Sequence, residues 1–271
     1  MHTPVVLTIA GSDNSAGAGA QADLKTISAL GGYALTAITC VVAEVPGRVT
    51  AIHPIPPAIV AEQIRLLLHA YPIAAIKTGM LYSSEILLAV LAALADITCP
   101  LIVDPVMVAT SGDPLLHADA IALYRTALFP RAPLITPNLD EVRTLLGTPV
   151  TTLPEMRTAG LHLARQHHCP FLIKGGHLTG PHATDLLCTP TGQVTEYTAP
   201  RTPGVKTHGT GCTTSAAIAT HLAHGLPLPA AIAEAKKYVT RAIAHTLQWQ
   251  CQGQTTQALH HFTENIRRPS K

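Results

Sequence analysis

The chain has 271 residues, of which 47% are hydrophobic and 13% charged, and its formal net charge is +2. This composition predicts a large buried core and excludes a disordered chain. The sequence contains no run of basic residues, so we expect no nucleic-acid partner. It also contains no window of about 18 uninterrupted apolar residues, so we expect no membrane-spanning helix.

The amino-terminal residues and the cysteines indicate the compartment. The first residues lack the basic region and the apolar stretch of a signal peptide. The six cysteines have neither CxxC nor zinc-ribbon spacing, and the 15 histidines form no HExxH motif. We therefore expect a cytoplasmic protein whose thiols are reduced.

Short apolar runs rich in β-branched residues alternate with longer amphipathic segments along the chain. In chain order, this pattern predicts a strand at 5–10, a helix at 21–30, a strand at 34–42, a helix at 57–69, a strand at 73–77, a helix at 84–95, strands at 101–103 and 134–136, helices at 139–146 and 155–166, a strand at 171–174, an antiparallel pair at 184–188 and 195–199, and helices at 212–224 and 229–247. Such alternation is typical of a mostly parallel sheet with helices on both faces. We therefore expect an α/β fold with three layers, α/β/α, in a single domain of residues 1–266, followed by a polar tail of residues 267–271.

Polar or glycine-rich clusters follow most of the predicted strands. In a parallel sheet with helices on both faces, ligands bind beyond the carboxyl ends of the strands, so these clusters should meet at one cleft. The clusters lie at residues 11–19, 44, 77–80, 104, 138–141 and 174–176.

The segment from Thr207 to Cys212 is a glycine-rich turn that enters a predicted helix. Backbone N–H groups at the positive end of a helix dipole can hold a phosphate and stabilise charge on a transferred phosphoryl group. At the first helical turn, we expect the pKa of Cys212 to fall below the usual value of about 8.5, which would make Cys212 a weak base. The alternative interpretation is a helix start with glycine for tight packing.

A second cluster, residues 11–23, follows a strand and precedes a helix. It matches neither GxGxxG nor a Walker motif, so a dinucleotide fold gains little support. Its glycines permit close approach of the backbone to a ligand. Asp23 is a candidate anchor for a polar substrate, or alternatively a solvated first-turn Asp that favours the helix dipole.

Four further residues at predicted strand ends have two interpretations each. Asn138 and Glu141 have the spacing of a capping box, and could alternatively position hydrated Mg²⁺ near nucleotide phosphates. Lys174 is a candidate charge partner for a phosphate, or a surface lysine before a turn. Asp104 is a candidate metal or water ligand, or a turn former.

Seven motifs occur in an order that matches a known family. They are residues 10–26 (AGSDNSAGAGAQADLKT), 77–81 (KTGML), 103–116 (VDPVMVATSGDPLL), 136–141 (TPNLDE), 174–178 (KGGHL), 207–217 (THGTGCTTSAA) and 260–262 (HHF). With these motifs the chain resembles the hydroxymethylpyrimidine/phosphomethylpyrimidine kinases of thiamine biosynthesis, within the ribokinase-like superfamily. The resemblance implies phosphorylation, dependent on ATP and Mg²⁺, of 4-amino-5-hydroxymethyl-2-methylpyrimidine and then of its monophosphate, by a homodimer.

The resemblance also implies roles for individual residues. The catalytic residues that it implies are Gly209, Thr210, Gly211, Cys212 and Lys174. Those implied on the pyrimidine side are Asp23, Glu44, Met80 and Val106. Those implied on the nucleotide side are Asn138, Glu141, Lys174 and Thr207, and the implied metal ligands are Asp104 and Glu141.

The chain departs from the family pattern at a few positions. Glu44 stands where the family usually has Gln. An ionised carboxylate can only accept hydrogen bonds, so Glu44 keeps both contacts with an aminopyrimidine edge only if the ring nitrogen or the carboxyl is protonated. Thr110 and Lys206 replace a Lys and an Asn on the phosphate side, and Ala16 replaces a Gly.

Two other functions remain open at the level of sequence. Relatives of this subfamily also phosphorylate vitamin B6, so a pyridoxal/pyridoxine kinase is the nearest alternative. The departures from the family pattern also allow a pyrimidine-binding protein that is catalytically impaired.

Overall fold

The computed structural model of the chain describes residues 3–107, 118–205 and 208–263. Nine strands form one sheet in the order β3-β2-β1-β4-β5-β6-β7-β8-β9. They are β1 (Val5–Asp13), β2 (Tyr33–Val45), β3 (Arg48–Pro54), β4 (Ile73–Thr78), β5 (Leu101–Val103), β6 (Leu134–Ile135), β7 (Phe171–Lys174), β8 (His182–Cys188) and β9 (Val194–Pro200). The six strands from β2 to β7 in this order pair in parallel, whereas β3, β8 and β9 join the two edges antiparallel.

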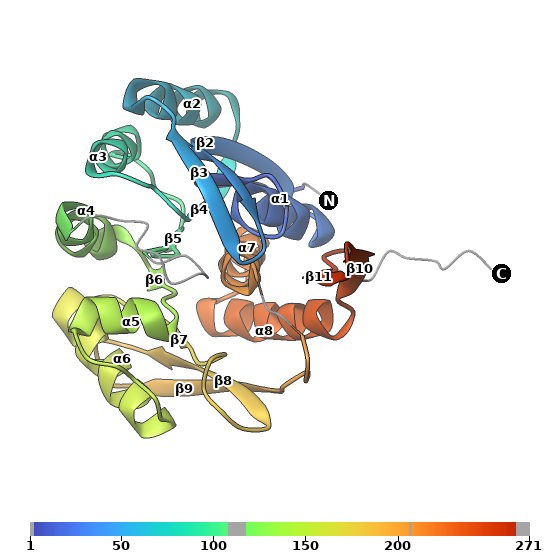
Figure 1. Cartoon of the computed structure of the whole chain (residues 1–271). Coiled ribbons are helices and arrows are strands. Elements are labelled where there is room, and N and C mark those ends of the chain that lie inside the picture. Colours follow the sequence, from blue (N-terminus) through green and yellow to red (C-terminus); the bar gives the residue numbers. More distant parts are fainter. Residues whose placement is uncertain (1–2, 108–117, 206–207, 264–271) are drawn as a thin grey trace.

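Helices cover both faces of the sheet, as Figure 1 shows. The helices are α1 (Gly19–Ala29), α2 (Pro57–Ala70), α3 (Ser84–Ala93), α4 (Ala118–Leu123), α5 (Leu139–Leu146), α6 (Leu153–His167), α7 (Thr210–Ala223) and α8 (Leu228–Ala244). One apolar core lies under α1, α7 and α8, and the other lies under α2 to α6. The predicted three-layer α/β/α fold with a mostly parallel sheet is confirmed.

Helix α7 is the central helix of its layer. It contacts β1, β4 and β5 as well as α1 and α8. Ala216, Ala217 and Ala219 are fully buried, and such small side chains let the helix approach the sheet closely. As a result, the amino terminus of α7 lies at the carboxyl ends of the central strands.

Two β-hairpins were not predicted from the sequence. Strand β2 continues to Val45 and turns into β3, whose residues are all at least partly exposed. The last helix, predicted at 229–247, ends at Ala244 in the structure. Residues 247–258 instead form the hairpin of β10 (Leu247–Cys251) and β11 (Gln254–Ala258). The sequence of β10, LQWQC, does alternate apolar and polar residues, but all five residues are exposed, so the strand buries no apolar face against the core.

Helix α4 and the helical stretch that follows it were also missed. A π-helical turn (Tyr124–Leu128) and a 3₁₀ turn (Phe129–Arg131) follow α4 and lead into β6. All six cysteines are free. Within the described ranges, none of the helices has the length and apolar character that a membrane span needs. The polar tail of residues 267–271 lies outside the described ranges, and the single-domain organisation stays a prediction.

Candidate active site

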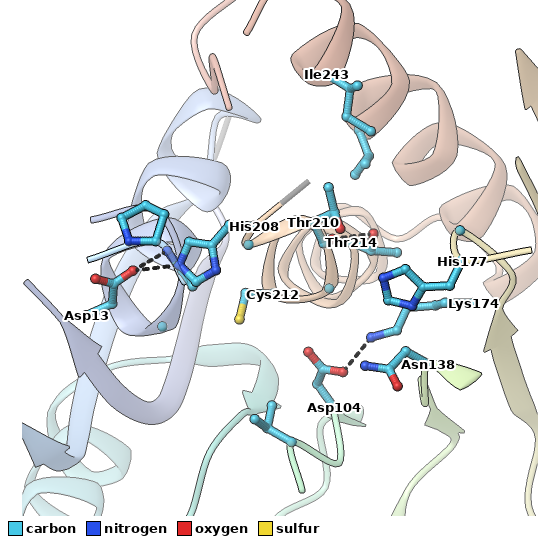
Figure 2. Close-up of a pocket in the computed structure, with 18 of the residues that line it drawn as sticks. Asp13, Asp104, Asn138, Lys174, His177, His208, Thr210, Cys212, Thr214 and Ile243 are labelled. Carbon is cyan, nitrogen blue, oxygen red and sulfur yellow. Dashed lines mark hydrogen bonds and ion pairs between the residues drawn. The ribbon is translucent and has the colours of Figure 1, made fainter. Parts of the chain in front are cut away.

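A cavity of about 1050 Å³ opens at the carboxyl ends of the parallel strands. Figure 2 shows Cys212 near its centre, between the Asp13–His208 pair and the Lys174–Asp104 pair. Most of the predicted site residues line this cavity: Glu44, Met80, Asp104, Val106, Asn138, Glu141, Lys174, Gly209, Thr210, Gly211 and Cys212. Thr207 lies outside the described residues.

The first turn of α7 faces this cavity. Gly209 precedes the helix with a φ of 81°, in the left-handed region that favours glycine, and its position carries no side-chain cap. The N–H groups of a first helical turn have no carbonyl partner within the helix, and the helix dipole adds positive potential there. Such a turn is suited to bind an anion such as a phosphate.

The two glycine-rich segments pack against each other. A Cβ atom on Gly209 would overlap the backbone carbonyl of Gly17, so space as well as backbone conformation requires glycine there. A Cβ atom on Gly19 would lie 2.5 Å from the carbonyl oxygen of Gly11. The 11–19 loop and the start of α7 therefore form one continuous wall of the cavity.

Asp13 organises the 11–19 loop, and sequence reasoning gave it no role. Its Oδ1 accepts the N–H of Ser15 at 2.7 Å, and its Oδ2 accepts the N–H of Ala18 at 2.7 Å and lies 3.3 Å from His208 Nε2. Burial by itself would raise the pKa of Asp13, but the hydrogen bonds from His208, Ser15 and Ala18 outweigh it and lower the pKa to about 2. Asp13 is therefore an ionised residue that joins this loop to His208 at the start of α7.

Lys174 and Asp104 form a buried ion pair on the opposite wall. Lys174 Nζ lies 2.8 Å from Asp104 Oδ1, which also accepts the hydroxyl of Thr136 at 3.2 Å. The other oxygen, Oδ2, accepts the hydroxyl of Ser215 on α7 at 3.2 Å. Burial opposes ionisation of Asp104, but the charges of Lys174 and Lys77 outweigh it and lower the pKa of Asp104. Lys174 is thereby fixed as a cation beside α7.

Asn138 and Glu141 form the predicted capping box at the start of α5. The Asn138 side chain accepts the N–H of Glu141 at 2.9 Å, and Glu141 Oε2 accepts the N–H of Asn138 at 2.7 Å. Burial raises the pKa of Glu141 to about 8, against the opposing charge of Lys174. Both side chains also line the cavity, so the structural role and the predicted ligand role are compatible.

The acidic residues of this wall fit a metal that arrives with a nucleotide. Among the described residues, no group of three or more His, Cys, Asp or Glu side chains could hold a metal ion. Mg²⁺ usually keeps several waters and is bound by one or two carboxylates together with substrate phosphates. Asp104 and Glu141 supply two carboxylates at the cavity wall, which fits this mode of binding.

Asp23 lies behind the cavity wall, and this placement corrects its predicted role as a direct substrate ligand. Its side chain is fully buried, so it is not a solvated first-turn residue either. Asp23 Oδ2 accepts from Lys77 Nζ at 2.7 Å and from the Thr8 hydroxyl at 2.6 Å. Of this pair, Lys77 lines the cavity and Asp23 does not. Asp23 therefore acts on the site through the Lys77 ammonium.

The prediction that the pKa of Cys212 is lowered was wrong. Burial raises the pKa of Cys212 to about 11, although the Lys77 ammonium and the N–H of Gly19 act in the opposite direction. The negative charges of Asp23 and Asp104 also oppose a thiolate. Cys212 is therefore a neutral thiol near pH 7, because desolvation outweighs the favourable helix terminus.

Comparison with known proteins identifies the family. A family model described as phosphomethylpyrimidine kinase matches residues 13–257. The chain belongs to the phosphomethylpyrimidine kinase family. It is 43% identical over 240 residues to the hydroxymethylpyrimidine/phosphomethylpyrimidine kinase of Streptomyces coelicolor. The matched region covers 89% of this chain and 88% of that protein. It is also 43% identical over 239 residues to a thiamine biosynthesis bifunctional protein of Geobacter sulfurreducens, but this match covers only 49% of that longer protein and 88% of this chain.

Solved structures of two kinds share the fold. The crystal structure of phosphomethylpyrimidine kinase from Clostridium difficile is 36% identical, with a TM-score of 0.77, over 89% of this chain and 100% of that chain. The ADP complex of Bacillus subtilis pyridoxal kinase is 30% identical, with a TM-score of 0.85, over 95% of this chain and 98% of that chain. The fold is therefore that of the ribokinase-like vitamin kinases, as predicted.

Glu44, the main departure from the phosphomethylpyrimidine kinase pattern, lies in the β2–β3 hairpin. Its backbone N–H donates to Asn14 Oδ1 at 2.7 Å, which ties the hairpin to the 11–19 loop. Burial raises the pKa of Glu44, and the negative charge of Asp13 adds to this shift. Ala16 has a φ of 58°, a conformation that glycine adopts more readily. Thr110 and Lys206, the other departures, lie outside the described residues.

A second pair of residues that sequence reasoning missed supports the loop after β7. Asp185 on β8 accepts the N–H of Gly175 at 3.1 Å and pairs with Lys236 Nζ on α8 at 2.8 Å. Arg201 adds hydrogen bonds to the carbonyls of Gly176 and Leu178, both at 2.6 Å. These residues are far apart in the sequence, and no local motif connects them with the loop after β7.

Proposed function

We propose that this protein transfers the terminal phosphoryl group of ATP to the hydroxymethyl group of 4-amino-5-hydroxymethyl-2-methylpyrimidine and then phosphorylates the monophosphate. One observation carries this proposal. A methyl group on Gly211 would lie 3.1 Å from Lys174 Nζ, so the ammonium and the first turn of α7 face the same small volume next to Cys212. Family membership and the similar solved kinases support the reaction type.

The residues of this volume suit a phosphoryl transfer that depends on positioning and charge. The transition state of such a transfer is loose and spreads negative charge over the transferred oxygens. Lys174, held by Asp104, and the N–H groups of residues 210–212 would stabilise that charge. Cys212 is a neutral thiol and cannot accept a proton in that state, so it would orient the acceptor hydroxyl. The hydroxyl proton would pass late in the reaction to an oxygen of the transferred phosphoryl group, which a loose transition state permits.

ATP and Mg²⁺ are the cofactors of this proposal. Bound Mg²⁺ would neutralise charge on the β- and γ-phosphate oxygens. Asp104 and Glu141 are the residues that would hold it, and Asn138 and Lys174 would contact the nucleotide.

Glu44, Met80 and Val106 form the proposed pyrimidine side of the cavity. Because the pKa of Glu44 is raised, a protonated carboxyl could donate to a ring nitrogen while it accepts from the amino group. This would reproduce the pairing that an amide side chain offers. The same carboxyl could instead accept from a protonated ring, so pyridoxal is the second candidate acceptor.

Release of ADP, measured with each acceptor at the same ATP concentration, tests the proposal. We expect turnover with hydroxymethylpyrimidine that exceeds turnover with pyridoxal, and a second product when the monophosphate is supplied. Faster turnover with pyridoxal than with hydroxymethylpyrimidine would show that pyridoxal, and not the pyrimidine, is the preferred acceptor. Binding of hydroxymethylpyrimidine without turnover of either acceptor would indicate a binding protein.

The variant Cys212→Ser tests the role of the thiol. We expect kcat to fall about 100-fold, because the acceptor hydroxyl loses the group that orients it, with little change in the KM for ATP. Near-normal turnover would remove Cys212 from the mechanism.

Gel filtration with light scattering would test the proposed homodimer, and cell fractionation would test the proposed cytoplasmic location.

A further inference from the structure

One residue of the first turn of α7 faces away from the cavity. Of residues 209–214, Thr213 is the one that does not line it, and its side chain is fully buried. The Thr213 hydroxyl lies 3.1 Å from Nε2 of His261 and 2.9 Å from the carbonyl oxygen of Gly209. His261 therefore contacts the turn from behind, although it lies 48 residues further along the chain.

The direction of the hydrogen bond between Thr213 and His261 follows from the other partner of the hydroxyl. The Thr213 hydroxyl donates its one hydrogen to the Gly209 carbonyl at 2.9 Å, so Nε2 of His261 donates to the Thr213 oxygen at 3.1 Å. The His261 side chain is 3% exposed, and burial together with the charge of Lys25 lowers its pKa to about 4, so the ring is neutral near pH 7 and carries one proton.

The Thr213 hydroxyl closes the first turn of α7 on its buried side. It donates to the Gly209 carbonyl at 2.9 Å, and the same carbonyl accepts the backbone N–H of Thr213 at 3.0 Å. A threonine whose hydroxyl bonds the carbonyl four residues earlier tends to bend its helix. Because His261 Nε2 contacts the Thr213 oxygen at 3.1 Å, it fixes the direction of this side chain and, through it, the Gly209 carbonyl.

The segment that carries His261 is itself anchored. The Tyr238 hydroxyl on α8 donates to the His261 carbonyl at 2.8 Å, and the N–H of His260 donates to the Ala242 carbonyl at 3.3 Å. Leu259 is 3% exposed. The ring of His261 is therefore held against α7 by α8 and cannot swing freely.

We propose that His261 is a positioning residue for phosphoryl transfer, which holds the first turn of α7 through the Thr213 hydroxyl and so aligns the N–H groups of residues 210–212 at the cavity. This role rests on the proposed kinase function. It assigns a purpose to the His-His-Phe segment, which no part of the proposed mechanism otherwise uses.

Two measurements on the full-length protein test this role. Steady-state kinetics of His261→Ala and Thr213→Val should show kcat at least about tenfold lower, with little change in KM for the acceptor, because misplacement of the anion-binding groups affects the transition state. Hydrogen–deuterium exchange, followed by mass spectrometry, should be faster in peptides that cover residues 208–214 and unchanged in the central strands. The double variant should be no slower in kcat than the worse single variant, because both remove the same contact.

Matched variants separate positioning from general loss of structure. Thr220→Val removes another buried hydroxyl from α7, one that bonds the Ala216 carbonyl at 2.7 Å, far from the first turn. His260→Ala changes the neighbouring histidine. Both should keep kcat and the exchange of residues 208–214 within about twofold of the original protein. His261→Gln, whose amide NH2 can replace Nε2 as donor, should recover much of the lost activity.

The outcomes distinguish this inference from the proposed function. If the original protein turns over hydroxymethylpyrimidine but His261→Ala keeps normal kcat and normal exchange, the positioning role is wrong and the function stands. If the original protein turns over no acceptor, the proposed function fails, and the exchange measurement alone decides whether His261 holds the turn. Additive effects in the double variant would also overturn the proposal.

Discussion

The ammonium of Lys77 lies 2.7 Å from Asp23 Oδ2, and both side chains are completely buried beside the cavity that contains Cys212. A buried ion pair becomes strongly destabilising when one partner is removed, because the other charge stays in a medium of low polarity. The other oxygen of Asp23 is buried with no hydrogen-bond partner among the described residues. The pair therefore depends on a single close contact.

Removing one member of this pair should destabilise the fold more than removing both. We expect Lys77→Met and Asp23→Asn each to lower the free energy of unfolding by about 3 kcal/mol or more. The double variant should lose less free energy of unfolding than either single variant. Urea unfolding followed by circular dichroism measures the three values, and strictly additive losses would show that the two charges do not stabilise each other.

Cys212 should react slowly with alkylating reagents at neutral pH. Its pKa is raised to about 11 by burial, so the thiolate fraction, and with it the rate with iodoacetamide, should rise about tenfold per pH unit from pH 7 to 10. Peptide mapping by mass spectrometry separates Cys212 from the exposed Cys251. A rate that levels off near pH 8 would contradict the raised pKa, and circular dichroism at each pH serves as the control for folding.

The hydrogen bonds of Asp13 should contribute stability that disappears in acid. Its folded pKa of about 2 lies below the ordinary value of 3.8, so the contribution is present above about pH 4 and is lost as the pH falls toward 2. The size of the shift corresponds to about 2 kcal/mol. We expect Asp13→Asn to be less stable than the original protein by about this amount at pH 7, with the difference shrinking at pH 3. A difference that is independent of pH would point to packing instead of charge.

Gly211→Ala should separate stability from activity. Alanine favours a helix over glycine by up to about 1 kcal/mol, so the variant should be at least as stable as the original protein. Its methyl group would lie 3.1 Å from Lys174 Nζ, in the volume assigned to the transferred phosphoryl group, so kcat should fall about 100-fold. Urea unfolding provides the control for folding. A kcat equal to that of the original protein would argue against an anion site beside Gly211.

Glu141→Gln should weaken the use of Mg²⁺ without unfolding the protein. Glutamine also serves at the third position of a capping box, so stability should change by less than about 1 kcal/mol. The Mg²⁺ concentration for half-maximal turnover should rise about tenfold, the usual effect of losing a supporting carboxylate.

The pH dependence of this Mg²⁺ requirement provides the control. Because the pKa of Glu141 is raised to about 8, protons compete with the metal, and the original protein should need less Mg²⁺ as the pH rises from 7 to 9. The variant should lack this trend. An unchanged Mg²⁺ requirement in Glu141→Gln would leave Asp104 as the only proposed ligand of the two.

The sequence by itself determined the alternation of strands and helices, the capping box at Asn138 and the family. These features depend on local patterns: apolar periodicity and motifs whose residues are neighbours in the chain. Cys212 and Lys174 could be chosen as site residues for the same reason. The hairpin strands β3 and β10 escaped prediction although β10 alternates apolar and polar residues, because neither strand buries a residue in the core and a local pattern therefore does not separate them from loops.

Only the tertiary structure decided which residues meet across long separations. The Asp13–His208 contact joins residues 195 positions apart, and no spacing rule announces such a pair. Burial also reversed the expected effect of the helix terminus on Cys212 and moved Asp23 from a substrate contact to the support of Lys77. Desolvation depends on how completely the folded chain surrounds a group, and that quantity has no local signature in the sequence.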